Sequence, residues 1–194
     1  MHNKPLERNI CSARSKCSIL ALYRKESEVF EIVRAVFPDD LKDVLDLYRE
    51  YIDSTSVDLS FQDNEQEFNL LPEKYSSEES KIFLLKKDSK PIGCAAFRKL
   101  DEVACEMKRV YIRPSARGSN QGAKLVDRVL QEAAVSGYKK ICLDVLPEFK
   151  TALKLYRSYG FVEHPPVTNN PVPGTHFMGL NLERYNQALL RSSR

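Results

Sequence analysis

Segments with strand periodicity and segments with helical periodicity alternate along residues 29–183 of this 194-residue chain. A chain built this way buries its apolar residues by packing helices on a central sheet, so the pattern predicts a mixed α/β fold in one domain. The expected elements are a strand over 29–37, a helix over 41–52, a shorter helix and loop over 61–75, strands over 81–87, 91–99 and 103–112, a helix over 121–136, a strand over 139–146, a helix over 149–160 and a strand over 175–183.

The two ends of the chain differ from this body. Residues 1–28 hold Lys and Arg but few acids, and their apolar stretch is too short for a signal peptide. We interpret them as a loosely ordered extension or the product of an upstream start codon, with a transit peptide as the alternative. The expected organisation is therefore an extension over 1–28, a domain over 29–185 and a tail over 186–194.

Composition excludes several functional classes. The net charge of +3 gives no indication of nucleic-acid binding, although a basic extension could tether the domain to RNA. No apolar run approaches the roughly 20 residues of a membrane span. Five scattered cysteines favour reduced thiols and a cytoplasmic setting, three of them as small buried residues in strands. These are Cys11, Cys17, Cys94, Cys105 and Cys142.

No metal site is expected. The chain contains no Cys-x-x-Cys pair, and His2, His164 and His176 lack the spacing of metal ligands.

The stretch VYIRPSARGSNQGAKLV, residues 110–126, joins a strand to a helix through Pro114, Arg117, Gly118 and Gly122. A helix N-terminus carries unpaired N–H groups and partial positive charge, and glycines let a phosphate approach them. The segment lacks the Gly-Lys-Ser/Thr of a Walker loop and the Gly-x-Gly-x-x-Gly of a dinucleotide site. Taken alone, it fits a phosphate-binding loop and a plain strand-to-helix turn equally well.

Two motifs together resemble the GNAT acetyltransferase superfamily. Arg117-Gly118-Ser119-Asn120-Gln121-Gly122 is similar to the family's Arg/Gln-x-x-Gly-x-Gly/Ala loop, and ALKLYRSYGFV (152–162) resembles its second motif. The resemblance covers about residues 29–183. It implies a mixed sheet flanked by helices, in which the strand 103–112 splays from the strand 139–146 at an acetyl-CoA site.

The resemblance also implies which residues bind acetyl-CoA. The loop would hold the pyrophosphate, the backbone of the strand before it would pair with pantetheine, and an N–H near Tyr111 would meet the thioester oxygen. The implied binding residues are Val110, Tyr111, Ile112, Arg117, Gly118, Ser119, Asn120, Gln121, Gly122 and Ala123. Two residues depart from the family pattern. Asn120 replaces the middle glycine, and Phe149 replaces an asparagine that helps to hold pantetheine.

Glu106 is the candidate general base. It lies six residues before Ile112, where some members of the family place a catalytic glutamate. Simple alternation puts Glu106, Lys108 and Val110 on one face of their strand. The alternative is a structural glutamate that pairs with Lys108 or another neighbour, in which case Asp144 is the next candidate.

Tyr156 is the candidate general acid, because many members carry this tyrosine near the sulfur of CoA. The alternative is a packing residue on an amphipathic helix, and Tyr159 is the lesser candidate. A thiol pKa near about 8.5 makes the thiolate a tolerable leaving group, so the contribution of an acid should be modest. The segment PPVTNNPVPG (165–174) is interpreted as a rigid connection that could also wall the acceptor pocket.

The resulting prediction is an N-acetyltransferase in which an amine attacks acetyl-CoA directly. The favoured acceptor is a primary amine on a small molecule. A protein N-terminus or lysine, and a non-catalytic CoA-binding regulatory module, are the alternatives. A homodimer is left open.

Overall fold

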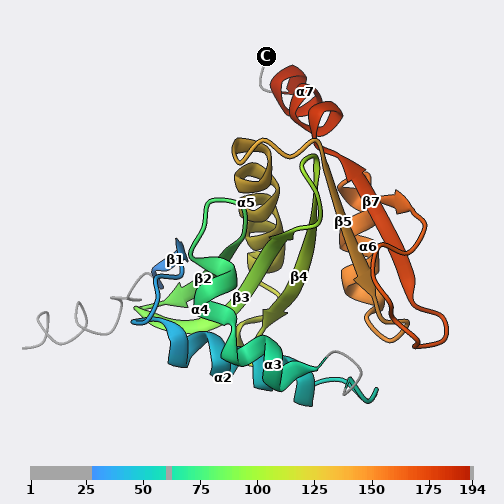
Figure 1. Cartoon of the computed structure of the whole chain (residues 1–194). Coiled ribbons are helices and arrows are strands. Elements are labelled where there is room, and N and C mark those ends of the chain that lie inside the picture. Colours follow the sequence, from blue (N-terminus) through green and yellow to red (C-terminus); the bar gives the residue numbers. More distant parts are fainter. Residues whose placement is uncertain (1–27, 60–62, 193–194) are drawn as a thin grey trace, which may run out of the picture.

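The computed structural model describes residues 28–59 and 63–192, which form a seven-stranded sheet with helices on both faces (Figure 1). The predicted mixed α/β fold is confirmed. The strands are β1 (Phe30–Arg34), β2 (Lys81–Lys87), β3 (Lys90–Lys99), β4 (Ala104–Ile112), β5 (Lys140–Val145), β6 (Val162–Glu163) and β7 (His176–Asn181). The helices are α2 (Leu41–Asp53), α3 (Asn64–Asn69), α4 (Leu71–Tyr75), the 3-10 turn η2 (Pro114–Ala116), α5 (Gln121–Val135), α6 (Lys150–Ser158) and α7 (Leu182–Ser192).

The strand order is β1-β2-β3-β4-β5-β7-β6, and β4–β5 is the parallel pair. That pair is short. It runs from Ala104↔Lys140 to Glu106↔Cys142, and beyond it the two strands diverge (Figure 1). The separation of these two strands that the family resemblance implies is therefore present, and it opens the middle of the sheet.

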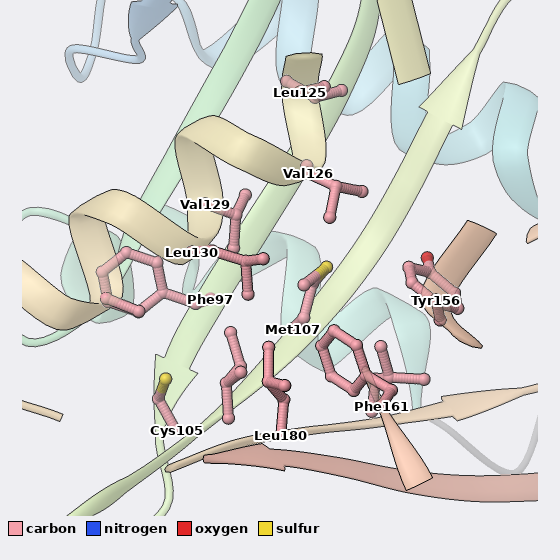
Figure 2. Close-up of a cluster of buried hydrophobic side chains, with 14 of the residues drawn as sticks. Phe97, Cys105, Met107, Leu125, Val126, Val129, Leu130, Tyr156, Phe161 and Leu180 are labelled. Atoms are coloured by element: carbon pink, nitrogen blue, oxygen red, sulfur yellow. The ribbon is translucent and has the colours of Figure 1, made fainter. Parts of the chain in front are cut away.

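One face of the sheet is covered by α5 and α6 (Figure 2). The apolar stripe predicted for α5 forms the centre of this core, where it meets Phe97 of β3 and Met107 of β4. The buried residues that α5 contributes are Leu125, Val126, Val129, Leu130 and Ala133.

The other face is covered by α2, α3 and α4, which form a second core against β2 and β3. The structure confirms that three cysteines are small buried residues. Cys94 lies in this second core, Cys105 lies in the α5 core, and Cys142 is buried on β5. Burial raises the pKa of the Cys94 thiol to about 12 and also raises that of Cys105.

A bulge in β4 corrects one prediction. The register steps from Ala96↔Lys108 to Cys94↔Tyr111, so three steps along β4 match two along β3, and Arg109 has a left-handed φ of 55°. The extra residue reverses the alternation that follows it. Val110 therefore packs on the α5 core, as Met107 does, and the expectation that Glu106 and Val110 share one face is wrong.

The C-terminal segment also differs from its prediction. The last strand ends at Asn181 rather than continuing to residue 183, and α7 follows directly. Asn181 caps this helix, since its side-chain oxygen accepts from the Arg184 amide N–H at 2.9 Å. Helix α7 occupies most of the predicted tail, whereas the predicted extension lies, apart from Glu28, outside the described residues.

Within residues 28–59 and 63–192, no helix combines the length and the apolar character that crossing a membrane requires.

Candidate active site

A cavity of about 890 Å³ lies where β4 and β5 diverge. Its walls come from the second half of β4, from β5, from the loop before α5 and from the start of α6. Nine of the ten residues predicted to bind acetyl-CoA line it, and so does Tyr156. The nine are Val110, Tyr111, Ile112, Arg117, Gly118, Asn120, Gln121, Gly122 and Ala123.

The loop before α5 has the backbone geometry of an anion-binding turn. Gly118 and Asn120 both have positive φ, 88° and 59°, and Asn120 is the N-cap of α5. Asparagine adopts this left-handed conformation more readily than most residues, which explains how it can replace a glycine here. Successive N–H groups in such a turn point into one concavity, where the start of a helix adds positive potential.

Gly122 leaves space at the mouth of this concavity. A Cβ atom built on Gly122 would find Ile112 Cδ1 at 3.7 Å, an ordinary contact. The protein interior therefore does not demand a glycine at this position. The space beside it belongs to the cavity.

The side chains of the loop hold its shape. Arg117 Nε donates to the Ile112 carbonyl at 2.9 Å, and its guanidinium lies over the Tyr111 ring. The Ser119 hydroxyl donates to the Ala116 carbonyl at 3.2 Å, and Ser119 does not line the cavity. Arg117 thus ties the loop to the end of β4, while Ser119 closes the turn on itself.

Gln121 supplies a second feature that fits a polar ligand. Its side-chain Oε1 atom is buried and has no hydrogen-bond partner among the described residues, although Gln121 lines the cavity. A buried polar atom without a partner is costly, so a donor brought by a ligand would satisfy it. Together with the loop, this fits a ligand that carries both phosphate and amide groups, as CoA does.

Tyr156 reaches the cavity from α6. Its ring packs edge-on against Phe161, with the centroids 5.6 Å apart, and its hydroxyl points away from that core (Figure 2). The hydroxyl makes no hydrogen bond within the described part of the chain, and burial raises the pKa of Tyr156 well above its usual value. Tyr159 differs, because its hydroxyl donates to the Ala123 carbonyl at 3.0 Å.

Glu106 does not line this cavity. Its side chain is 1% exposed, and its Oε2 atom accepts from Arg98 Nε at 2.6 Å. Its Oε1 atom accepts a longer bond, 3.4 Å, from the Thr168 hydroxyl. Of the partners that the structural alternative allowed, the neighbour Arg98 pairs with Glu106 and Lys108 does not.

A second cavity, of about 250 Å³, opens beside Thr168. The segment 165–174 walls it with Thr168 and Asn169, and Asn170 donates to Asp144 Oδ2 at 2.7 Å. Lys108 and Asp144 line both cavities. The two cavities are therefore neighbours that share these two wall residues, close to Glu106↔Cys142, the last pair of the joined strands.

Tyr51 and Arg109 line the large cavity but carry no signal in the sequence. Arg109 sits at the bulge, pairs with Glu67 of α3, and lies 5.5 Å from the ring centres of Tyr48 and Tyr51 of α2. These contacts join segments more than 40 residues apart. Only the bulge brings Arg109 to that face, and no local motif predicts a bulge.

No group of three or more His, Cys, Asp or Glu side chains arranged to hold a metal ion occurs within the described ranges.

Comparison with known proteins identifies the family. The profile of the acetyltransferase (GNAT) family matches residues 41–161. An uncharacterized N-acetyltransferase of Schizosaccharomyces pombe is 34% identical over 150 residues, which cover 76% of this chain and 91% of that protein.

Solved structures have the same fold. A GNAT-family acetyltransferase from Staphylococcus aureus superposes with a TM-score of 0.67 at 16% identity, covering 79% of this chain and 99% of that one. A putative acetyltransferase from Salmonella typhimurium, solved with acetyl-CoA, gives a TM-score of 0.58 at 20% identity and covers 79% of this chain and 94% of its own. With the fold and both motifs in place, this chain belongs to the GNAT family of acetyltransferases.

Proposed function

We propose that this protein transfers the acetyl group of acetyl-CoA to a primary amine by direct attack of the amine, and that the acceptor is a small molecule. The observation that carries the proposal is a pair of neighbouring cavities that share Lys108 and Asp144 where β4 and β5 diverge. The larger cavity suits acetyl-CoA, which the Salmonella structure was solved with. The smaller cavity would give an amine a separate approach to the wall that the two cavities share.

The loop from Arg117 to Ala123 would hold the pyrophosphate through its backbone N–H groups. Val110 and Ile112 lie on the stretch of β4 that no longer pairs with β5, so the Val110 backbone and the Ile112 N–H would be available to pantetheine amides, while the Ile112 carbonyl already accepts from Arg117. An N–H near Tyr111 would then face the thioester oxygen, where negative charge develops during attack.

Glu106 would take the proton of the amine through an intervening group rather than directly, because it lines neither cavity. Thr168 provides the link. It lines the smaller cavity and contacts Glu106 Oε1. A base that acts through one hydroxyl or water remains within the usual geometry of proton transfer.

Tyr156 would return a proton to the departing thiolate. Its raised pKa keeps the hydroxyl protonated at the pH of an assay. The Tyr156→Phe variant is expected to lose about 100-fold or less in kcat, the low end for a positioned acid, because a thiolate leaves readily. CoA affinity should hardly change, since the ring still packs on Phe161.

Tyr138→Phe is the matched control for steady-state kinetics with acetyl-CoA at saturation. Tyr138 is also buried in the α5 core, but it lines neither cavity. If Tyr156→Phe turns over as fast as the parent, Tyr156 is a packing residue.

The direct test combines binding with turnover. Acetyl-CoA should bind in calorimetry with one site per chain, and a screen of small amines should reveal acceptors that release free thiol from acetyl-CoA. Acetyl-CoA binding without thiol release on any amine or peptide would indicate a regulatory module, and release on peptides alone would indicate a protein acetyltransferase. Absence of acetyl-CoA binding would refute the proposal altogether.

A further inference from the structure

The smaller cavity has an unusual balance of charged groups. Three cations line it, Lys74 of α4, Arg98 of β3 and Lys108 of β4, together with three carboxylates, Asp63, Glu67 and Asp144. Charges of both signs in so small a space suggest that its ligand also carries both.

The carboxylates of this cavity are largely engaged. Glu67 pairs with Arg109, and Asp144 accepts from the Asn170 amide at 2.7 Å. Asp63 caps α3, with the Gln66 N–H donating to its side chain at 3.4 Å. A purely cationic acceptor would therefore find carboxylates that already have partners.

The cations of this cavity keep most of their donors free. The side chains of Lys74 and Lys108 form no hydrogen bond or ion pair with any other residue that the structure describes, and the Arg98 side chain uses only its Nε atom, toward Glu106. A lysine offers three donors, and the two terminal nitrogens of an arginine form a fork that matches a carboxylate.

The two kinds of group also differ in position. Asp144 lines both cavities, so an amine in the smaller one could reach it from the side of the thioester. The Asn170 amide contacts only its Oδ2 atom, and its Oδ1 atom has no hydrogen-bond partner among the described residues. Lys74 and Arg98 line only the smaller cavity. An acceptor could thus place its amine beside Asp144 and an anionic group toward Lys74 and Arg98.

We infer that the acceptor is an amino acid, a small molecule that carries a free carboxylate as well as its primary amine. The inference rests on the proposed function, because it assumes that the reaction is acetyl transfer to an amine. Its physical content is that the smaller cavity binds a carboxylate.

The substrate test uses matched acceptors. Each standard L-amino acid is compared with its carboxamide and its decarboxylated amine in the thiol-release assay. At least one amino acid should exceed both analogues about 10-fold or more in kcat/KM, the worth of one charge-assisted hydrogen bond. Equal or better turnover of the analogues, or a preference for polyamines, would overturn the inference and leave the proposed function standing.

The variant test uses charge reversal at the cavity wall. Lys74→Glu should raise KM for the amino acid about 10-fold, leave kcat within about twofold, and leave KM for the carboxamide unchanged. Lys90→Glu is the matched control, since Lys90 is exposed at the opposite end of β3 from Arg98 and lines neither cavity. An identical response of amino acid and carboxamide to Lys74→Glu would count against a carboxylate in this cavity.

A binding measurement separates the two proposals. Ligand-observed NMR with a pool of N-acetyl-L-amino acids, in the presence of CoA, should show contact that Lys108→Gln weakens, and a pool of their carboxamides should show none. This result does not depend on turnover. If neither acetyl-CoA binding nor thiol release occurs, the proposed function fails. The NMR measurement would still show whether the smaller cavity binds a carboxylate. No contact by the N-acetyl-L-amino acids would refute the inference.

Discussion

The Gly122→Val variant is expected to bind acetyl-CoA at least about 100-fold more weakly than the parent. The loop lines the cavity, and a branched side chain on Gly122 would stand where a pyrophosphate would approach its N–H groups. Losing one or two charge-assisted hydrogen bonds accounts for a change of this size, about 3 kcal/mol. Calorimetric titration with acetyl-CoA measures it.

The fold of this variant should survive. Gly122 lies in the first turn of α5, its φ is not left-handed, and the nearest atom to an added Cβ is Ile112 Cδ1 at 3.7 Å. Valine also has a higher helix propensity than glycine. Gln131→Val, at an exposed position of the same helix, is the control. Parental affinity in a folded Gly122→Val protein would show that the loop does not bind the phosphates.

The Glu106→Gln variant is expected to lose about 100-fold in kcat at pH 7, the low end for a positioned base. Glutamine keeps the size of the side chain but cannot take a proton from the acceptor. An alkylamine with a pKa near about 10.4 is almost entirely protonated at pH 7, so the variant depends on the small neutral fraction. That fraction grows about tenfold for each pH unit below the amine pKa, so the deficit should shrink as pH rises.

The measurement is kcat against pH with saturating acetyl-CoA, for the parent, Glu106→Gln and a control. Glu31→Gln is the control, because Glu31 is an exposed strand glutamate at the far edge of the sheet. CoA affinity should match the parent, whereas the melting temperature should fall, because glutamine removes the buried carboxylate that pairs with Arg98. A pH profile identical to that of the parent would make Glu106 a structural partner of Arg98 and direct attention to Asp144.

The sequence predicted best what is encoded locally. The turn from Arg117 to Ala123 joins a strand to a helix within one short motif, so its local shape followed from the residues, whereas its place at an acetyl-CoA site was implied by the resemblance to the GNAT family. The apolar stripe of α5 was likewise predicted, because a period of 3.6 residues is visible in a single segment.

Features that depend on cross-strand register could not be predicted this way. The prediction of the face on which Val110 lies was wrong, because the bulge at Arg109 is defined only by pairing with β3. The smaller cavity gathers side chains from α3, α4, β3, β4, β5 and the segment 165–174, and no single stretch of sequence signals it. The strand pattern continued through Asn181, although this residue caps a helix by accepting from the Arg184 N–H three residues later.

The buried cysteines can report which helical layer separates from the sheet when the protein opens. Cys94 lies in the core under α2 and Cys105 in the core under α5, so each thiol is shielded by a different helical layer. Because only an exposed thiolate reacts with an alkylating reagent, each thiol is labelled at the rate at which its own layer separates from the sheet. Equal labelling rates would mean that both layers detach in one cooperative event, whereas unequal rates would show which side of the sheet loosens first.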